Sequence, residues 1–289
     1  MGIDDIRTVA VVGAGTMGSQ IAHQVGLAGY PVRLYSRTRK RLDQAIPATQ
    51  RLLRKRVEKG KLEAEACEQA LTRVTATTTL AEAVDGVDLV IKSVVEDRDT
   101  KRDVFCELDR LAPPHAILAS NSSTMPSSFF ADCVTDPARL LNVHFFNPAL
   151  MMQLVEVVQG PHTSDATVET AMEFARRLGK TPVLVRRESY GFIVNRILFI
   201  AMQEAFRLVE AGVVSREDCD LAVRNGLNWP MGPFELADLV GLDVTADILE
   251  QGAEQTGEER WRPTPVLRGL VDAGKLGRKT GEGFLRYDG

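Results

Sequence analysis

Residues 8–18 read Thr-Val-Ala-Val-Val-Gly-Ala-Gly-Thr-Met-Gly, and this stretch decides the fold of the 289-residue chain. Its first part, 8–12, is a short continuous apolar run, which is typical of a parallel strand buried on both faces. The run ends in a Gly-x-Gly-x-x-Gly loop and leads into residues 19–28, whose apolar spacing suits a helix. A second apolar run, 32–35, follows a Gly-Tyr-Pro turn. The order predicts strand, glycine loop, helix and strand.

Strand-like and helix-like segments continue to alternate as far as residue 185. Further strand-like runs lie at 87–91, 116–119, 140–146, 153–158 and 182–185, and helical patterns lie at 99–111 and 165–178. Residues 38–71 are predicted to form one long helix or two consecutive helices that break at Gly60. Alternating strands and helices indicate a mostly parallel sheet, so we expect a Rossmann-type, doubly wound α/β fold.

Beyond residue 188 the pattern becomes almost entirely helical. Helices are predicted at 192–211, 216–224 (with Ser215 as N-cap), 233–240, 243–255 and 264–272. We therefore expect two domains. Residues 1–187 form a dinucleotide-binding domain with a helical insertion near 38–71, and residues 188–289 form a smaller all-α domain.

Composition excludes several classes of protein. Apolar residues make up 44% of the chain and charged residues 26%, which excludes a disordered or fibrous protein. A net charge of −4 gives no sign of a nucleic-acid binder. The longest apolar stretch is too short to span a membrane, and the N-terminus has no signal-peptide pattern, so a cytoplasmic location is expected. Four scattered cysteines predict reduced thiols and no metal site: Cys67, Cys106, Cys133 and Cys219.

The glycine loop predicts a dinucleotide site because it follows a buried strand and opens a helix. Gly13 permits the tight turn, Gly15 lets the backbone approach a pyrophosphate, and Gly18 lets the helix pack closely on the strand. The helix start at Thr16 and Met17 offers free N–H groups and a positive dipole end to the phosphates. The alternative is a strand–helix turn that simply needs small residues.

The end of the second predicted strand indicates which dinucleotide is bound. An NAD site usually has an acidic residue there to bind the ribose 2′-hydroxyl, but this chain has Ser36, Arg37, Thr38 and Arg39. Arginine binds a phosphate through charge-assisted hydrogen bonds, whereas a carboxylate would repel it. We expect NADP(H) to be preferred and NAD(H) to be possible, with Ser36, Arg37 and Thr38 reading the 2′-phosphate. In the alternative, Arg37 and Arg39 are solvated residues beside an NAD site.

Several further motifs occur in a fixed order along the chain. They are Val-Val-Glu-Asp at 94–97, Ala-Ser-Asn-Ser-Ser at 119–123, His-Phe-Phe-Asn-Pro at 144–148, Leu-Val-Glu-Val-Val at 154–158, Gly-Phe-Ile-Val-Asn-Arg at 191–196, Met-Gly-Pro-Phe-Glu at 231–235 and Gly-Arg-Lys-Thr-Gly-Glu-Gly-Phe at 277–284. With the glycine loop, this set resembles the 3-hydroxyacyl-CoA dehydrogenase family, of the 3-hydroxybutyryl-CoA dehydrogenase type, over essentially the whole chain. The resemblance implies reversible hydride transfer between NAD(P)(H) and a short-chain 3-hydroxyacyl-CoA or 3-oxoacyl-CoA.

The resemblance implies a catalytic dyad of His144 and Glu156. The residues themselves favour the same pair: His144 is the histidine, of four, at the carboxyl end of a predicted strand, where open α/β sheets bind ligands. Glu156 lies in an apolar strand, where a carboxylate is costly without a partner. The alternative is a structural buried pair. By resemblance, Ser123 and Asn195 donate to the substrate oxygen, although Ser123 could instead be a helix N-cap or turn residue.

Other site residues are also implied by the resemblance. Glu96 and Lys101 match cofactor contacts around the nicotinamide ribose; the alternatives are an exposed strand-end glutamate and a helix-start lysine. Asn147 is an expected substrate contact, or else only a turn residue before Pro148.

A basic segment predicts an anion site. Residues 33–61 contain eleven Lys/Arg but only two acidic residues. Coenzyme A carries phosphates, and the family's substrate contacts include this segment, so Arg54, Lys55 or Lys59 is expected to bind it. A solvated helix face is the alternative.

The family resemblance also predicts a homodimer formed through the helical domain, with neither nucleic acid nor membrane as partner. The apolar positions expected to contribute to the dimer contact include Ile197, Leu198, Ala201, Ala205 and Leu208. Two other functions stay open. One is a related dehydrogenase of a sugar acid or another free 3-hydroxy acid, and the other is a nucleotide-binding relative without turnover.

Overall fold

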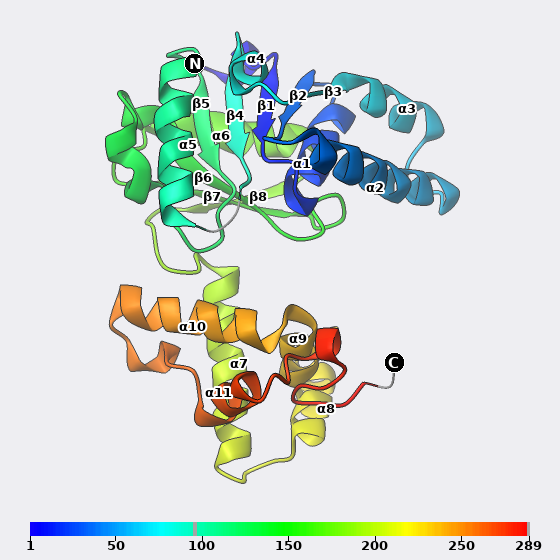
Figure 1. The fold of residues 1–289 in the computed structure, drawn as a ribbon, viewed down its shortest axis with the longest axis vertical. Helices are drawn as coiled ribbons and strands as arrows, with labels where there is room; N and C mark the ends of the chain where they lie inside the picture. The colour runs from blue at the N-terminus through cyan, green and yellow to red at the C-terminus, as the bar shows by residue number, and fades with distance from the viewer. Residues whose placement is uncertain (95–96, 288–289) are drawn as a thin grey trace. The chain divides into compact units, whose positions relative to one another are not determined.

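The computed structural model describes residues 1–94 and 97–287. The chain divides into two compact units, Met1–Ser189 and Tyr190–Gly289 (Figure 1). The first unit is an α/β fold and the second is helical, so the predicted fold class is confirmed.

The first unit is built on a sheet of eight strands in the order β3-β2-β1-β4-β5-β6-β7-β8. The strands are β1 Val9–Val12, β2 Val32–Tyr35, β3 Val74–Thr77, β4 Leu89–Lys92, β5 Ile117–Ser120, β6 Leu140–Phe145, β7 Leu154–Val158 and β8 Thr181–Val185. Neighbouring strands are parallel except β6 and β7, which are antiparallel. The order reverses at β1, next to the glycine loop, which is where open α/β sheets bind their ligands.

Both faces of the sheet are covered, as the alternation along β1 requires. Val9 and Val11 pack with α1 (Thr16–Leu27) and α6 (Asp165–Arg177) on one face. Ala10 and Val12 pack on the other face. That face is covered by α4 Leu80–Val84, α5 Arg98–Leu111 and the 3₁₀ helix η2 Ser127–Cys133. All four β1 side chains are fully buried, so β1 is the centre of the core.

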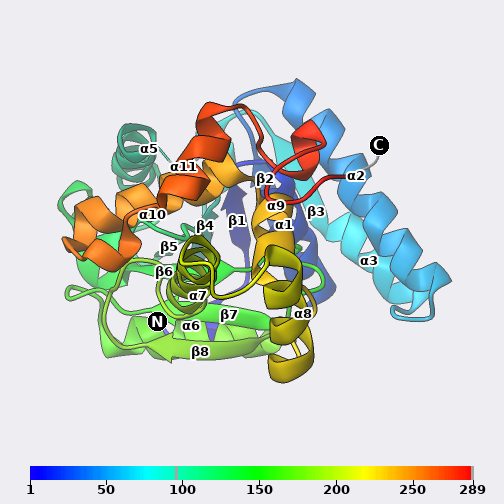
Figure 2. The ribbon, with the colours of Figure 1, turned by 90° about the horizontal axis from the view of Figure 1, so that it is seen from below.

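The segment predicted as helical over 38–71 forms two helices, α2 (Arg39–Glu58) and α3 (Ala64–Arg73), which break around Gly60. They lie side by side beyond the β3 edge of the sheet (Figures 1 and 2). Leu53 of α2 and Cys67 of α3 pack with Leu150, from the connection between β6 and β7, in a small separate apolar cluster.

One strand and one α-helix were missed by the sequence prediction. They are β3, which follows α3 directly, and the short helix α4. The sequence of β3 is Val-Thr-Ala-Thr, and it is an edge strand that lacks the buried apolar pattern of the central strands. Its pairing with β2, rather than its own hydrophobicity, therefore defines it as a strand.

The second unit contains α7 Val194–Glu210, α8 Arg216–Leu227, α9 Pro233–Val240, α10 Leu242–Thr256 and α11 Pro265–Asp272. Ser215 accepts a hydrogen bond from the backbone N–H of Asp218, so it is the predicted N-cap of α8. Phe206, Phe234 and Trp261 are fully buried in the unit's apolar core. None of the described helices is long and apolar enough to cross a membrane. All four cysteines are free thiols, as predicted.

Candidate active site

His144 and Glu156 form a buried hydrogen-bonded pair. They face each other directly in the antiparallel β6–β7 register, and the distance from His144 Nδ1 to Glu156 Oε2 is 2.8 Å. The exposed fraction is 5% for His144 and zero for Glu156. Because a carboxylate can only accept, Nδ1 of His144 carries the hydrogen and donates a hydrogen bond to Glu156. In the neutral imidazole, Nε2 then carries no hydrogen.

The loop after β5 is tied to the carboxyl end of β6. Asn121 Oδ1 accepts from the Phe145 backbone N–H at 2.8 Å, and its Nδ2 donates to Ser93 Oγ at 3.2 Å. Ser123 lies half-buried in the bend that follows. The N-cap of η2 is Pro126, so Ser123 does not cap this helix. Ser123 is therefore a bend residue in a loop that hydrogen bonds hold against the strand of His144.

Two glycines of the glycine loop lie so close to neighbouring backbone atoms that neither position has room for a Cβ. A Cβ on Gly18 would lie 1.8 Å from the carbonyl oxygen of Gly13, and one on Gly13 would lie 2.2 Å from that of Ser93. These two glycines let α1 pack on the loop between the strands. A Cβ on Gly15 would meet no described atom within 4 Å, so Gly15 faces open space. The loop therefore leaves room for a ligand at Gly15, at the N-terminus of α1.

A cavity of about 300 Å³ adjoins the loop. Its lining includes Gly13 and Gly15 together with Ser36, Arg37 and Thr38 from the end of β2. This grouping fits the adenosine half of a dinucleotide, because the pyrophosphate side and the ribose side open into one space. The residues that we predicted as the cofactor reader thus share a cavity with the glycine loop.

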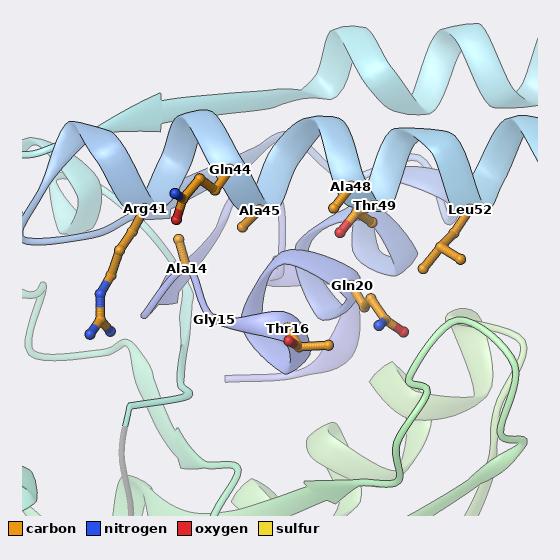
Figure 3. Close-up of a pocket in the computed structure, with 10 residues that line it drawn as sticks. All are labelled: Ala14, Gly15, Thr16, Gln20, Arg41, Gln44, Ala45, Ala48, Thr49 and Leu52. Atoms are coloured by element: carbon orange, nitrogen blue, oxygen red, sulfur yellow. The ribbon is translucent and has the colours of Figure 1, made fainter. Parts of the chain in front are cut away.

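A second cavity, of about 370 Å³, lies between the start of α1 and one face of α2 (Figure 3). Gly15, Thr16 and Gln20 line it from the glycine loop and α1. The residues from α2 recur at helical spacing and point toward the loop: Arg41, Gln44, Ala45, Ala48, Thr49 and Leu52. The cavity therefore extends the cofactor region along α2.

Models of two protein domains match the chain. Residues 8–189 match the NAD-binding domain of 3-hydroxyacyl-CoA dehydrogenase, and residues 191–287 match the C-terminal domain of the same enzyme. This chain belongs to the 3-hydroxyacyl-CoA dehydrogenase family. The predicted resemblance is therefore confirmed, and the family is one of oxidoreductases.

Individual relatives of this dehydrogenase-family chain match it over nearly its full length. It is 42% identical to a probable 3-hydroxybutyryl-CoA dehydrogenase of Deinococcus radiodurans, covering 96% of this chain and 99% of the relative. It is 39% identical to the human mitochondrial hydroxyacyl-coenzyme A dehydrogenase, covering 98% and 91%. The crystal structure of a (S)-3-hydroxybutyryl-CoA dehydrogenase from Ralstonia eutropha superposes with a TM-score of 0.94 at 34% identity, covering 99% and 100%.

Lys101 of this family member is fully buried, so it is not a solvated helix-start lysine. Its Nζ donates to Ser122 Oγ at 2.8 Å, and burial lowers its pKa to about 7. A second lysine, Lys92 at the end of β4, is also buried, with its Nζ 5.0 Å from the ring centroid of Phe105. Burial and the positive charge of Lys101 hold the pKa of Lys92 well below its usual range. The other predicted nicotinamide-side contact, Glu96, lies outside the described residues.

The predicted coenzyme A residues lie at the C-terminal end of α2. Lys55 lies three residues after Leu52 on α2, and Lys59 is the C-cap that follows Glu58; neither is among the described residues that line the second cavity. Arg54 is exposed and lies toward α3, where its charge acts on the Cys67 thiol.

The two remaining predicted substrate contacts lie in separate units. Asn147 is exposed in the turn after β6. Asn195 is half-buried in the first turn of α7, in the second unit.

Three residues of this region were not predicted. Arg41 lines both cavities, and only the helical phase of α2 distinguishes it from its basic neighbours. Asn121 belongs to the Ala-Ser-Asn-Ser-Ser motif at 119–123, but its hydrogen bond to the Phe145 backbone was not predicted. Lys180 donates to the carbonyls of Ala149 and Met152, in the connection between β6 and β7, at 2.7 and 2.9 Å. In the sequence, Lys180 is only a lysine between two apolar segments. No sequence pattern indicates that it contacts a loop 28 residues away.

Proposed function

We propose that this protein is an (S)-3-hydroxyacyl-CoA dehydrogenase that interconverts short-chain substrates such as 3-hydroxybutyryl-CoA and acetoacetyl-CoA. The observation that supports this most directly is the buried His144–Glu156 hydrogen bond of 2.8 Å. The pair lies in the sheet that carries the glycine loop. That loop lines a cavity whose residues fit the adenosine half of a dinucleotide. A proton-transfer group and a cofactor site are the two elements that reversible alcohol oxidation requires.

His144 is the proposed acid and base. In the oxidative direction its unprotonated Nε2 accepts the proton of the substrate 3-hydroxyl, and in the reductive direction the imidazolium returns a proton to the developing alkoxide. Imidazole suits both directions because its reference pKa of about 6.5 is close to neutrality. Glu156 fixes the tautomer by accepting the Nδ1 proton and stabilises the imidazolium through its negative charge.

Ser123 and Asn195 are the proposed neutral donors to the substrate oxygen. A hydroxyl and an amide stabilise a developing oxyanion without competing with His144 as acid or base. Asn147 is a proposed contact elsewhere on the substrate. We also propose that Arg54, Lys55 or Lys59 binds a phosphate of coenzyme A, because these basic residues continue beyond the part of α2 that lines the cavity next to the glycine loop.

The proposed cofactor is NADP(H), with NAD(H) accepted less well. When bound, the nicotinamide supplies the hydride acceptor or donor for substrate C3. The N–H groups at Thr16 and Met17 bind the pyrophosphate, and Ser36, Arg37 and Thr38 bind the 2′-phosphate. Lys101 is proposed to act on the nicotinamide-ribose side. A ribose-binding carboxylate would stand at position 36 in an NAD site, and its absence supports this preference.

The second unit is proposed to take part in substrate binding and to form a homodimer. Ile197 and Leu208 on α7 are 61% and 37% exposed, and a partner copy would cover such apolar side chains. Gel filtration tests this proposal, because elution at the monomer mass of 31.7 kDa would contradict it.

Initial rates of acetoacetyl-CoA reduction, measured with NADPH and with NADH, test the proposed function. We expect the faster rate with NADPH and, at the same concentration, little turnover of free acetoacetate. NADH-favoured rates would retain the enzyme class and reject the cofactor preference. Turnover of the free acid alone would support the alternative substrate class, and no rate with either substrate would support a nucleotide-binding relative without turnover.

A further inference from the structure

Arg41 occupies a position between the two cavities at the glycine loop. It lines the cavity that contains Ser36, Arg37 and Thr38, and it also lines the cavity beside Gly15. Figure 3 shows its side chain extending from α2 past Ala14. Within the described residues, Arg41 is not in an ion pair. Its guanidinium is therefore available to an anionic ligand in this region.

The neighbouring arginine on the same helix is already engaged. The Nε of Arg39 donates to Asp43 Oδ1 at 2.8 Å, one helical turn along α2. Arg39 also does not line either of the cavities beside the glycine loop. The two basic residues that do line the adenosine-side cavity are Arg37 and Arg41. Arg41 was not among the predicted reader residues Ser36, Arg37 and Thr38, but it lines the same cavity as all three.

The charge of this cavity favours a phosphate. Two guanidiniums line it, while the carboxylate among its described lining residues is Glu107 on α5. Glu107 and Arg37 both act on Tyr35: Glu107 raises the pKa of the phenol, after the larger effect of burial, and Arg37 lowers it. The cavity therefore has an acidic side at α5 and a basic side at the end of β2 and the start of α2.

We propose that Arg41, together with Arg37, forms a binding subsite for a phosphate monoester and so determines selectivity for a 2′-phosphorylated adenosine. This inference rests on the proposed use of NADP(H) and identifies a residue that enforces it. Two guanidiniums from different elements can donate to separate oxygens of one phosphate, which a hydroxyl cannot engage equally. Arg41 is thus a specificity residue, and the N–H groups at Gly15–Met17 bind the pyrophosphate that both cofactors share.

Calorimetric binding of nucleotide fragments to the full chain tests the proposal without turnover. The probes are 2′,5′-ADP (adenosine 2′,5′-bisphosphate) and 5′-AMP, which differ only in the 2′-phosphate, and the variants are Arg41→Gln and Arg41→Lys. We expect Arg41→Gln to weaken binding of 2′,5′-ADP by about 10- to 100-fold and to change binding of 5′-AMP by less than about 2-fold. Arg41→Lys should recover part of the loss, because it retains the charge but not the paired donors.

Arg39→Gln is the matched control, since it removes a guanidinium two residues away that Asp43 already pairs; both fragments should bind it as they bind the wild-type chain. Equal weakening of both fragments by Arg41→Gln would overturn the proposal and place Arg41 at the shared 5′-phosphate side. Unchanged binding of both fragments would also overturn it. If the wild-type chain itself does not distinguish the fragments, the NADP(H) preference fails, and the Arg41 assignment fails with it. A wild-type preference that Arg41→Gln leaves intact rejects the Arg41 assignment alone.

Discussion

His144 and Glu156 are cross-strand partners in an antiparallel pair, with 2.8 Å between Nδ1 and Oε2. The two residues come from β6 and β7, which are consecutive in the chain and adjacent in the sheet. These two strands run in opposite directions. A shift of the register by one residue would turn the two side chains to opposite faces. The strand pairing itself thus holds the orientation of the proposed acid–base group.

Glu156→Gln should lower kcat for acetoacetyl-CoA reduction by about 100-fold or more. The amide keeps the size of the side chain but removes the charge that stabilises the imidazolium, and its NH₂ group can enforce the wrong tautomer of His144. Steady-state kinetics check this. Glu169→Gln, at an exposed position on α6, should leave kcat unchanged. A wild-type kcat in Glu156→Gln would show that the pair is only structural.

Ser36→Asp should reverse the cofactor preference. A carboxylate at the end of β2 repels a 2′-phosphate and accepts from ribose hydroxyls, so kcat/KM with NADPH should fall by about 10-fold or more relative to NADH. Ser36→Asn adds a side chain of similar size to aspartate but without its charge. It should change the ratio of kcat/KM with NADPH to kcat/KM with NADH less than Ser36→Asp does. The ratio of the two kcat/KM values is the measurement, and an unchanged ratio in Ser36→Asp would show that residue 36 does not read the cofactor.

Glu107→Gln should tighten binding of 2′,5′-ADP several-fold, because it removes a negative charge from the cavity that Arg37 lines. Binding of 5′-AMP, which lacks only the 2′-phosphate, should change less. The same substitution should lower the pKa of Tyr35, since Glu107 raises it in the wild-type chain. Calorimetry and ultraviolet titration of the phenol check the two effects. Weaker binding of 2′,5′-ADP would instead indicate that Glu107 itself holds the nucleotide.

Lys92→Met should stabilise the protein at neutral pH, by about 1–4 kcal/mol in the free energy of unfolding. Burial lowers the pKa of Lys92, and that of Lys101 to about 7, so above those values the unfolded chain binds more protons than the folded one. Wild-type stability should therefore rise with pH from about 7 until the unfolded lysines lose their protons near pH 10.5.

Urea unfolding at several pH values checks this prediction. Lys92→Met should show both the higher stability at pH 7 and a shallower rise toward alkaline pH. Lys61→Met, at an exposed lysine, should match the wild-type curve. A variant that is less stable than the wild type at pH 7 would show that the Lys92 ammonium is stabilised by its aromatic neighbours rather than penalised by burial.

Local features of the sequence were sufficient for much of the first unit. The strand–glycine loop–helix unit at 8–28 could be predicted because its apolar run, its glycines and its helical spacing all act within a few residues. The helical character of the second unit followed from the same kind of local periodicity. Edge strand β3 was missed because Val-Thr-Ala-Thr becomes a strand through its pairing with β2.

In the candidate site, too, some residues could be predicted from the sequence and others became apparent only from the tertiary structure. Residue types and order along the chain were enough to single out His144, Glu156 and the Ser36–Thr38 segment. Only the tertiary structure decided that Arg41 rather than Arg39 shares the cavity with Arg37, and that Lys92 is buried near Lys101. The sequence determines backbone preferences over a few residues at a time. Which side chains meet depends on strand order, register and helix phase, because those bring distant segments of the chain into contact.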